Sequence, residues 1–117
     1  MYKCQLFQVA DLLGKKWTIV IIQEVALNGC KGFNAVFNKL KGISPKILSK
    51  RLKELEQKGI LQKQLISNKT PIRTSYTLTK KGRELQDIIT SFKNWNVKYS
   101  NEKLNCNEED CVNCSLY

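Results

Sequence analysis

Residues 44–58 constrain the fold more tightly than any other stretch of the sequence. Ser44 is suited to cap the start of a helix, and Pro45 fits the first helical position, where its missing N–H costs nothing. Leucines then recur at the spacing of one helix face, at Leu48, Leu52 and Leu55. Gly59 supplies a stop. We therefore predict a helix whose apolar back packs on a hydrophobic core.

The opposite face of this predicted helix is polar and cationic. At about 100° per residue, that face carries Lys46, Ser49, Lys50, Lys53 and Gln57. Taken alone, the pattern fits an ordinary surface helix with a solvated lysine face. It also fits a helix that faces a polyanion, and the surrounding sequence favours this second interpretation.

Positive charge is concentrated around the same helix. Residues 39–83 contain 13 lysines and arginines but only two acidic residues, Glu54 and Glu56. A cationic field this dense indicates nucleic acid as the partner. An anionic membrane surface fits less well, because no basic amphipathic helix with a broad exposed apolar face is evident.

The length of 117 residues leaves room for one domain, which we place at residues 1–100, and residues 101–117 form an acidic tail that contains cysteines. No apolar run approaches the length of a membrane span, and the N-terminus lacks the zones of a secretory signal, so we expect a cytoplasmic protein.

Histidine is absent, and no glycine-rich phosphate loop is present. Without the commonest general base, an enzyme is the weaker hypothesis.

Three further helices are predicted before residue 44. Apolar spacing over residues 6–13 indicates a short first helix that ends at Gly14. Residues 17–27 are apolar nearly all round and predict a buried central helix, although their β-branched side chains would also suit a strand. Residues 33–40 carry apolar side chains at i, i+3, i+4 and i+7. The short Lys-Gly-Ile link at 41–43 then makes a helix-turn-helix, whose second helix can enter the major groove.

After Gly59 the apolar period changes from that of a helix to that of a strand. Residues 60–67 predict one strand, 68–71 a turn and 74–78 a returning strand. The hairpin carries three cations, Lys63, Lys69 and Arg73. A basic hairpin beside a helix-turn-helix is the arrangement of a winged helix, so we predict an α+β, mainly helical fold. Such a wing would contact phosphates or reach into the minor groove.

Thr79 is suited to cap a last helix at residues 80–100. Along this helix runs one apolar stripe, formed by Leu85, Ile88, Ile89, Phe92, Trp95 and Tyr99. The body before residue 80 can cover only part of the stripe. The remainder either folds back on the domain or is buried against a second copy, and we predict a homodimer.

Five cysteines in a chain with no export signal argue against a structural disulfide framework. Cys106, Cys111 and Cys114 in the tail have a spacing that could hold zinc or an iron–sulfur cluster, with Cys4 or Cys30 as a fourth ligand. Thiol–disulfide chemistry is a second interpretation, and a tail without further function is a third.

Several motifs recur together in one known family. They are Cys4, Gly14-Lys15-Lys16-Trp17-Thr18, Phe33-Asn34, the block at 42–56, Gly59-Ile60-Leu61, Pro71, Tyr76-Thr77-Leu78-Thr79 and Gly82. The sequence resembles the HxlR-type branch of winged-helix transcriptional regulators, relatives of the MarR group. It departs from that pattern at Lys15, where a second glycine is usual, and at Ser75, where an acid is common.

The resemblance implies an obligate dimer, formed through the first and last helices, that binds a pseudo-palindromic operator. Leu6 would then join Ile88, Phe92, Trp95 and Tyr99 in the dimer interface. The helix at 44–58 would be the recognition helix, and the turn at 68–73 would be the wing tip. The expected DNA contacts are Ser44, Lys46, Ser49, Lys50, Lys53, Lys69 and Arg73.

Two residues have further expected roles. Arg51 lies on the flank of the recognition helix, where it would either read DNA or brace a neighbouring helix. Cys4 matches the position that some family members use to sense oxidants or electrophiles. A winged-helix module that binds other proteins of the transcription machinery is the alternative function, but the lysine face argues against it.

Overall fold

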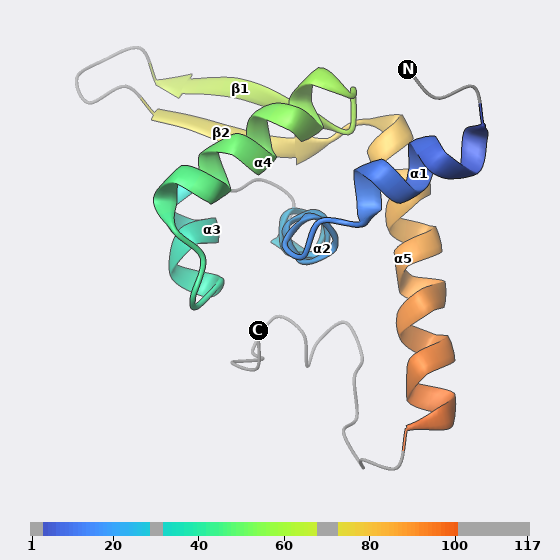
Figure 1. Ribbon diagram of the computed structural model, residues 1–117. Coiled ribbons are helices and arrows are strands. Elements are labelled where there is room, and N and C mark those ends of the chain that lie inside the picture. Colours follow the sequence, from blue (N-terminus) through green and yellow to red (C-terminus); the bar gives the residue numbers. More distant parts are fainter. Residues whose placement is uncertain (1–3, 29–31, 68–72, 101–117) are drawn as a thin grey trace.

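The computed structural model describes residues 4–28, 32–67 and 73–100 (Figure 1). Its elements in chain order are α1 (Gln5–Leu13), α2 (Thr18–Asn28), α3 (Phe33–Lys39), α4 (Pro45–Gln57), β1 (Leu61–Ser67), β2 (Arg73–Leu78) and α5 (Lys80–Tyr99). The mainly helical α+β fold is confirmed, with each element within two residues of its expected bounds. The predicted turn at 68–71 lies outside the described residues.

Helix α2 is the centre around which the other elements pack. Ile21, Ile22 and Val25 are fully buried, and the helix has neighbours in α1, α3, β2 and α5. The helical interpretation of residues 17–27 is therefore confirmed, and the strand alternative is wrong. A helix that is apolar nearly all round can pack against several neighbouring elements at once. The rest of the core comes from Val36, Leu40, Ile43, Leu48, Leu52, Leu55, Ile60, Leu61, Tyr76 and Ile89.

The hairpin is a two-stranded antiparallel sheet whose base joins the core. Leu61 lies opposite Leu78, and Lys63 lies opposite Tyr76. The register becomes irregular between Leu65 and Ser67, towards the far end of the hairpin. Residues Ile60, Leu61 and Tyr76 are buried, Ser75 is buried as well, and β2 also contacts α3, so the sheet packs on the body along β2 as well as at its base (Figure 1).

Two glycines form the turns on either side of α4. Gly42 has a φ of 97° and Gly59 a φ of 75°, a left-handed conformation that L-residues with a Cβ rarely adopt. Gly42 lies in the short link between α3 and α4, and Gly59 lies between α4 and β1. Both ends of α4 therefore turn sharply, which fixes its place in the helix-turn-helix.

Helix α5 is joined closely to the start of the hairpin. Thr79 caps it, since its side-chain oxygen accepts from the Gly82 amide at 3.1 Å, and the Thr79 amide donates to the Ile60 carbonyl at 3.1 Å. From there α5 runs well beyond the other elements (Figure 1). Among the described residues, no helix is both long enough and apolar enough to cross a membrane.

The close approach at Gly82 gives a prediction about stability. A Cβ at Gly82 would overlap the Ile60 carbonyl oxygen, which belongs to the backbone and cannot rotate away. We expect Gly82→Ala to lower the free energy of unfolding by about 3 kcal/mol through overpacking. Gly59→Ala is the matched control, because a Cβ there meets open space and only the left-handed conformation costs energy, about 1 kcal/mol.

Urea unfolding of both variants at equal protein concentration measures this difference. A loss at Gly82 no larger than the loss at Gly59 would contradict the described contact between α5 and Ile60.

Candidate nucleic-acid interface

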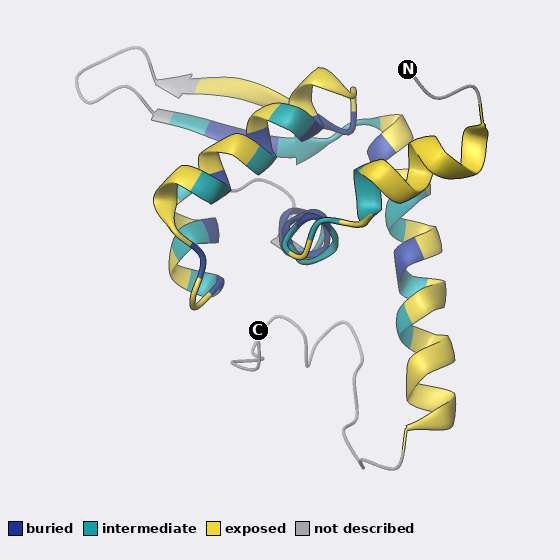
Figure 2. Cartoon of the chain, viewed as in Figure 1, coloured by how far each residue is buried: buried dark blue, intermediate teal, exposed yellow. Residues whose placement is uncertain are grey.

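The polar face of α4 is an open surface. Leu48, Leu52 and Leu55 are each 1 % exposed or less, so the apolar back is fully used in packing. Because the helical period is fixed, the opposite side is left to solvent (Figure 2). The predicted contact residues on that side are all exposed: Lys46, Ser49, Lys50 and Lys53.

The N-terminal end of α4 is built as the sequence indicated. The Ser44 hydroxyl oxygen accepts a hydrogen bond from the Ile47 amide at 3.1 Å, and Ser44 itself is exposed. Its hydroxyl proton stays available to an acceptor outside the protein. Together with the partial positive charge of a helix N-terminus, this makes the start of α4 suitable for a phosphate.

Two cations that were not predicted as DNA contacts lie close to this end of α4. The Lys16 ammonium is 5.0 Å from the centre of the Trp17 ring, and the edge of that ring lies against Gly42 in the turn before α4. Lys41, beside Gly42, is exposed. The signal that could have found Lys16 is the Lys-Trp pair before α2, since an aromatic ring can carry a cation on its face.

Arg51 turns towards its own helix. Its Nη1 lies 3.3 and 3.2 Å from the two carboxylate oxygens of Glu54, and its side chain is only 15 % exposed. Lys15, from the link between α1 and α2, donates to the same carboxylate at 3.1 Å. This geometry favours the bracing role for Arg51, although the partner lies within α4.

The charge state of Glu54 follows from these contacts. Burial raises the pKa of the Glu54 carboxyl, but the hydrogen bond from Lys15 and the charges of Lys15, Arg51 and Lys50 outweigh that effect. The pKa is therefore lower than its ordinary value. The group is a carboxylate at neutral pH.

The structure shows the base of the wing more fully than its tip. Lys63 and Leu65 on β1 are exposed, and Leu65 is 60 % exposed. Arg73 begins β2 opposite Ser67, and only its backbone is described. Lys69 lies outside the described residues. The two predicted wing contacts, Lys69 and Arg73, thus remain predictions.

A second surface, on α1 and α5, is apolar and exposed. Ile89 on α5 is buried and Leu85 is half-buried, so this side of α5 packs on the body. Several other large apolar side chains of the two helices are more than half exposed: Leu6, Phe7, Ile88, Phe92, Trp95 and Tyr99. None of the residues of α1 is buried. The expected division of the α5 stripe is confirmed, and in the described chain its outer part does not fold back on the domain.

Of the cysteines with a predicted role, the structure describes Cys4. It is an exposed free thiol at the start of α1. Cys30, Cys106, Cys111 and Cys114 lie outside the described residues. Within 4–28, 32–67 and 73–100, no three metal-binding side chains are grouped to hold an ion.

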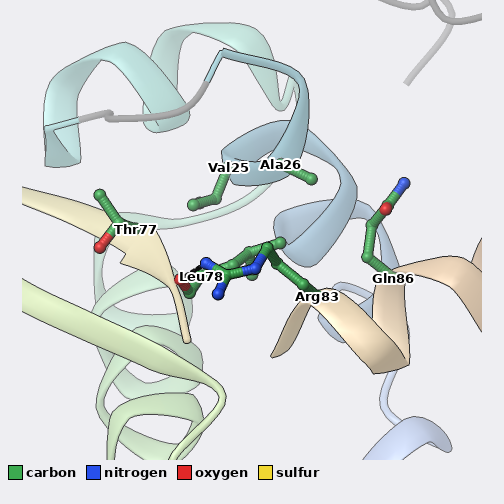
Figure 3. Close-up of a pocket in the computed structure, with 6 residues that line it drawn as sticks. All are labelled: Val25, Ala26, Thr77, Leu78, Arg83 and Gln86. Carbon is green, nitrogen blue, oxygen red and sulfur yellow. Dashed lines mark hydrogen bonds between the residues drawn. The ribbon is translucent and has the colours of Figure 1, made fainter. Parts of the chain in front are cut away.

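A hollow of about 380 Å³ lies between α2, the end of β2 and the start of α5 (Figure 3). It is lined by Val25, Ala26, Thr77, Leu78, Arg83 and Gln86. Arg83 Nη1 donates to the Leu78 carbonyl at 3.2 Å, which ties the start of α5 to the sheet. The polar residues of this lining are Thr77, Arg83 and Gln86.

Taken together, a tight turn, an amphipathic helix with a cationic outer face and a two-stranded hairpin define a winged helix-turn-helix protein. Comparison with known proteins specifies the family. Residues 12–104 match the HxlR-like helix-turn-helix family, and the chain therefore belongs to that family. The resemblance seen in the sequence is confirmed.

Its relatives are transcriptional regulators. The HTH-type transcriptional regulator YvaP of Bacillus subtilis is 36 % identical over 97 residues, which cover 82 % of this chain and 88 % of YvaP. YodB of the same organism is 42 % identical over 85 residues, which cover 73 % of this chain and 74 % of YodB.

Solved structures agree with this assignment. Reduced YodB superposes with a TM-score of 0.70 at 36 % identity, covering 86 % of this chain and 97 % of that one. The redox regulator HypR in its oxidised form gives 0.74 at 27 % identity, covering 85 % and 100 %. YodB is also known in diamide-treated and quinone-bound forms.

Proposed function

We propose that the protein is a homodimeric transcriptional regulator that binds specific sequences of double-stranded DNA. The observation that carries this proposal is the open face of α4, where Lys46, Ser49, Lys50 and Lys53 are exposed above a fully buried leucine back. In the major groove, lysines donate to guanine edges or to phosphates, and Ser49 bonds to either. Ser44 with the start of α4 holds a phosphate.

The wing adds a second point of contact in this proposal. Lys69 and Arg73 contact phosphates or enter the minor groove, as cationic side chains beside a recognition helix commonly do. A regulator of transcription works where the DNA is, so we place the protein in the cytoplasm. We assign no catalytic role, which agrees with relatives that are themselves transcriptional regulators.

The apolar surface of α1 and α5 supports the dimer. Exposed aromatic and aliphatic side chains on α1 and α5 are removed from water when two copies associate, and a symmetric pairing buries the same surface on both copies. The pair would present two α4 helices to one side of a duplex. Half-sites about 10 base pairs apart, one helical turn, match this geometry.

A module that binds other proteins is the alternative, and the exposed face of α4 argues against it. Contact helices in protein interfaces place apolar or aromatic anchors at the centre of the contact. Here the centre is occupied by lysines and a serine.

The recognition face is tested by removing single lysines. Lys46→Ala, Lys50→Ala and Lys53→Ala should each weaken operator binding with stability nearly unchanged, since exposed side chains contribute little to folding. The slope of log affinity against log salt should fall by about 0.9 for each phosphate contact removed. Fluorescence anisotropy across a salt series measures both effects.

Lys80→Ala is the matched control, because Lys80 is also exposed but lies at the start of α5, next to the end of β2 that pairs with the start of β1. Unchanged binding in both Lys46→Ala and Lys50→Ala would show that the recognition face is misassigned. A flat salt dependence in the unaltered protein would exclude DNA as the partner.

The dimer is tested on α5. Trp95, 65 % exposed, should lie inside the interface, so Trp95→Glu should convert the dimer to a monomer by burying an unpaired charge. Leu65→Glu is the control, because Leu65 has similar exposure but belongs to the wing. Sedimentation equilibrium distinguishes the two outcomes. A monomeric unaltered protein, or a Trp95→Glu variant that stays dimeric, would refute the interface.

We further propose that cysteine chemistry supplies the effector input. Cys4 is exposed at the start of α1, next to the apolar surface assigned to the dimer. Oxidation would join Cys4 to a second thiol of the dimer, the two thiols giving two protons and two electrons to the oxidant. The reduced, diamide-treated and quinone-bound forms of YodB support this chemistry.

Metal analysis of the purified protein tests the alternative of zinc or an iron–sulfur cluster at Cys106, Cys111 and Cys114.

The sensing proposal predicts that diamide changes operator affinity about tenfold or more, a coupling within the ordinary allosteric range. Dithiothreitol should reverse the change, because it reduces the disulfide. Cys4→Ser should abolish the response while leaving affinity in reductant unaltered. A Cys4→Ser protein that still responds to diamide would remove Cys4 from the mechanism.

A further inference from the structure

The carboxylate of Glu54 connects the recognition helix to a distant part of the chain. Lys15 donates to Oε2 at 3.1 Å, and the two residues are 39 positions apart in the sequence. Arg51, on the same side of α4, contacts both carboxylate oxygens. Both oxygens of Glu54 are therefore engaged, which restricts its side chain to one orientation.

Lys15 and Glu54 line a hollow between two helices. A hollow of about 130 Å³ separates α1 from the C-terminal end of α4. Its walls are Gln8, Asp11, Leu12, Lys15, Glu54, Gln57 and Lys58. The two helices face each other across this space, and α1 is held on the core lightly, because none of its residues is fully buried and Leu12 is only partly buried against the core. The pair of Lys15 and Glu54 bridges the two walls.

The Lys15–Glu54 pair contributes little to the free energy of folding, and its main effect is on the relative position of α1 and α4. The Lys15 side chain is 40 % exposed and that of Glu54 is 28 % exposed, so water screens the attraction. A paired contact across a gap nevertheless favours the separation at which the two charged groups meet, and together with the contacts between α1 and α2 that separation sets the angle between the helices. The contacts from Arg51 reduce the freedom that Glu54 would lose on pairing with Lys15.

We infer that the Lys15–Glu54 pair, held in place by Arg51, is a positioning contact that sets the angle between α4 and α1. In a dimer built on α1 and α5, this angle determines the distance between the two α4 helices. The pair thereby determines which spacing of operator half-sites the protein accepts. This inference rests on the proposed function, because it needs both the dimer and DNA binding.

The experiment measures spacing preference. A duplex is first selected by the unaltered protein from random-sequence DNA, and versions with one or two base pairs inserted between the half-sites are prepared. The ratio of affinities for the original and lengthened duplexes is then measured for the full chain, for Glu54→Gln and for Lys15→Gln. Glu56→Gln is the matched control, since Glu56 is an exposed acid on the same helix and is absent from the hollow.

The positioning role predicts that Glu54→Gln and Lys15→Gln each reduce this ratio about fivefold to tenfold, and that the double variant reduces it no further, as expected for residues that act as one unit. Lys15→Arg should retain the ratio. Glu54→Gln removes a negative charge beside a cationic face, and this change alone would raise affinity for every duplex. A fall in the affinity of Glu54→Gln for the original spacing therefore separates positioning from simple electrostatics. Glu56→Gln should leave the ratio unaltered.

The outcomes that would overturn the inference are distinct from those that overturn the function. If the unaltered protein selects no duplex, the proposed function fails. If it selects one, and Glu54→Gln and Lys15→Gln keep the same spacing ratio as Glu56→Gln, the positioning role is refuted while DNA binding stands. Circular dichroism confirms that each variant is folded before binding is measured.

Discussion

The burial of the leucine back of α4 is the interaction on which the rest of the structure depends. Leu48, Leu52 and Leu55 are almost fully removed from water, and they lie at one helical spacing. Once that face is buried, the rotation of α4 about its axis is fixed. The lysines on the opposite side of α4 must then face solvent. The cationic surface of α4 is therefore a direct consequence of apolar packing.

The segments before and after α4 keep the helix in place on the core. Gly42 and Gly59 allow the chain to turn sharply before and after α4, so its neighbours α3 and β1 can return to the same core. Thr79 and Gly82 then attach α5 to the backbone at Ile60. Helix α5, which carries the exposed aromatic side chains, is thus fixed at its N-terminal end to Ile60, just after α4 and the turn at Gly59.

The sequence allowed accurate prediction of features that depend on local spacing. Ser44 and Thr79 cap their helices, residues 17–27 form the central helix, and the α5 stripe is divided between core and solvent, because each of these follows from helical periodicity and nearby hydrogen bonds. The contact between Lys15 and Glu54 was not predictable. It joins residues 39 positions apart, and its existence depends on how α1 and α4 approach each other in three dimensions. The proximity of Trp17 to Gly42 was missed for the same reason.

The exposed outer half of α5 has a consequence for how the protein would respond to its own abundance. If each molecule carries half of the DNA-reading surface and finds the other half on a second copy, then at low concentration operator occupancy rises with the square of the number of molecules. Dilution also removes stability that association provides. A modest change in synthesis would then produce a steep change in the genes under control, without any alteration of the protein itself.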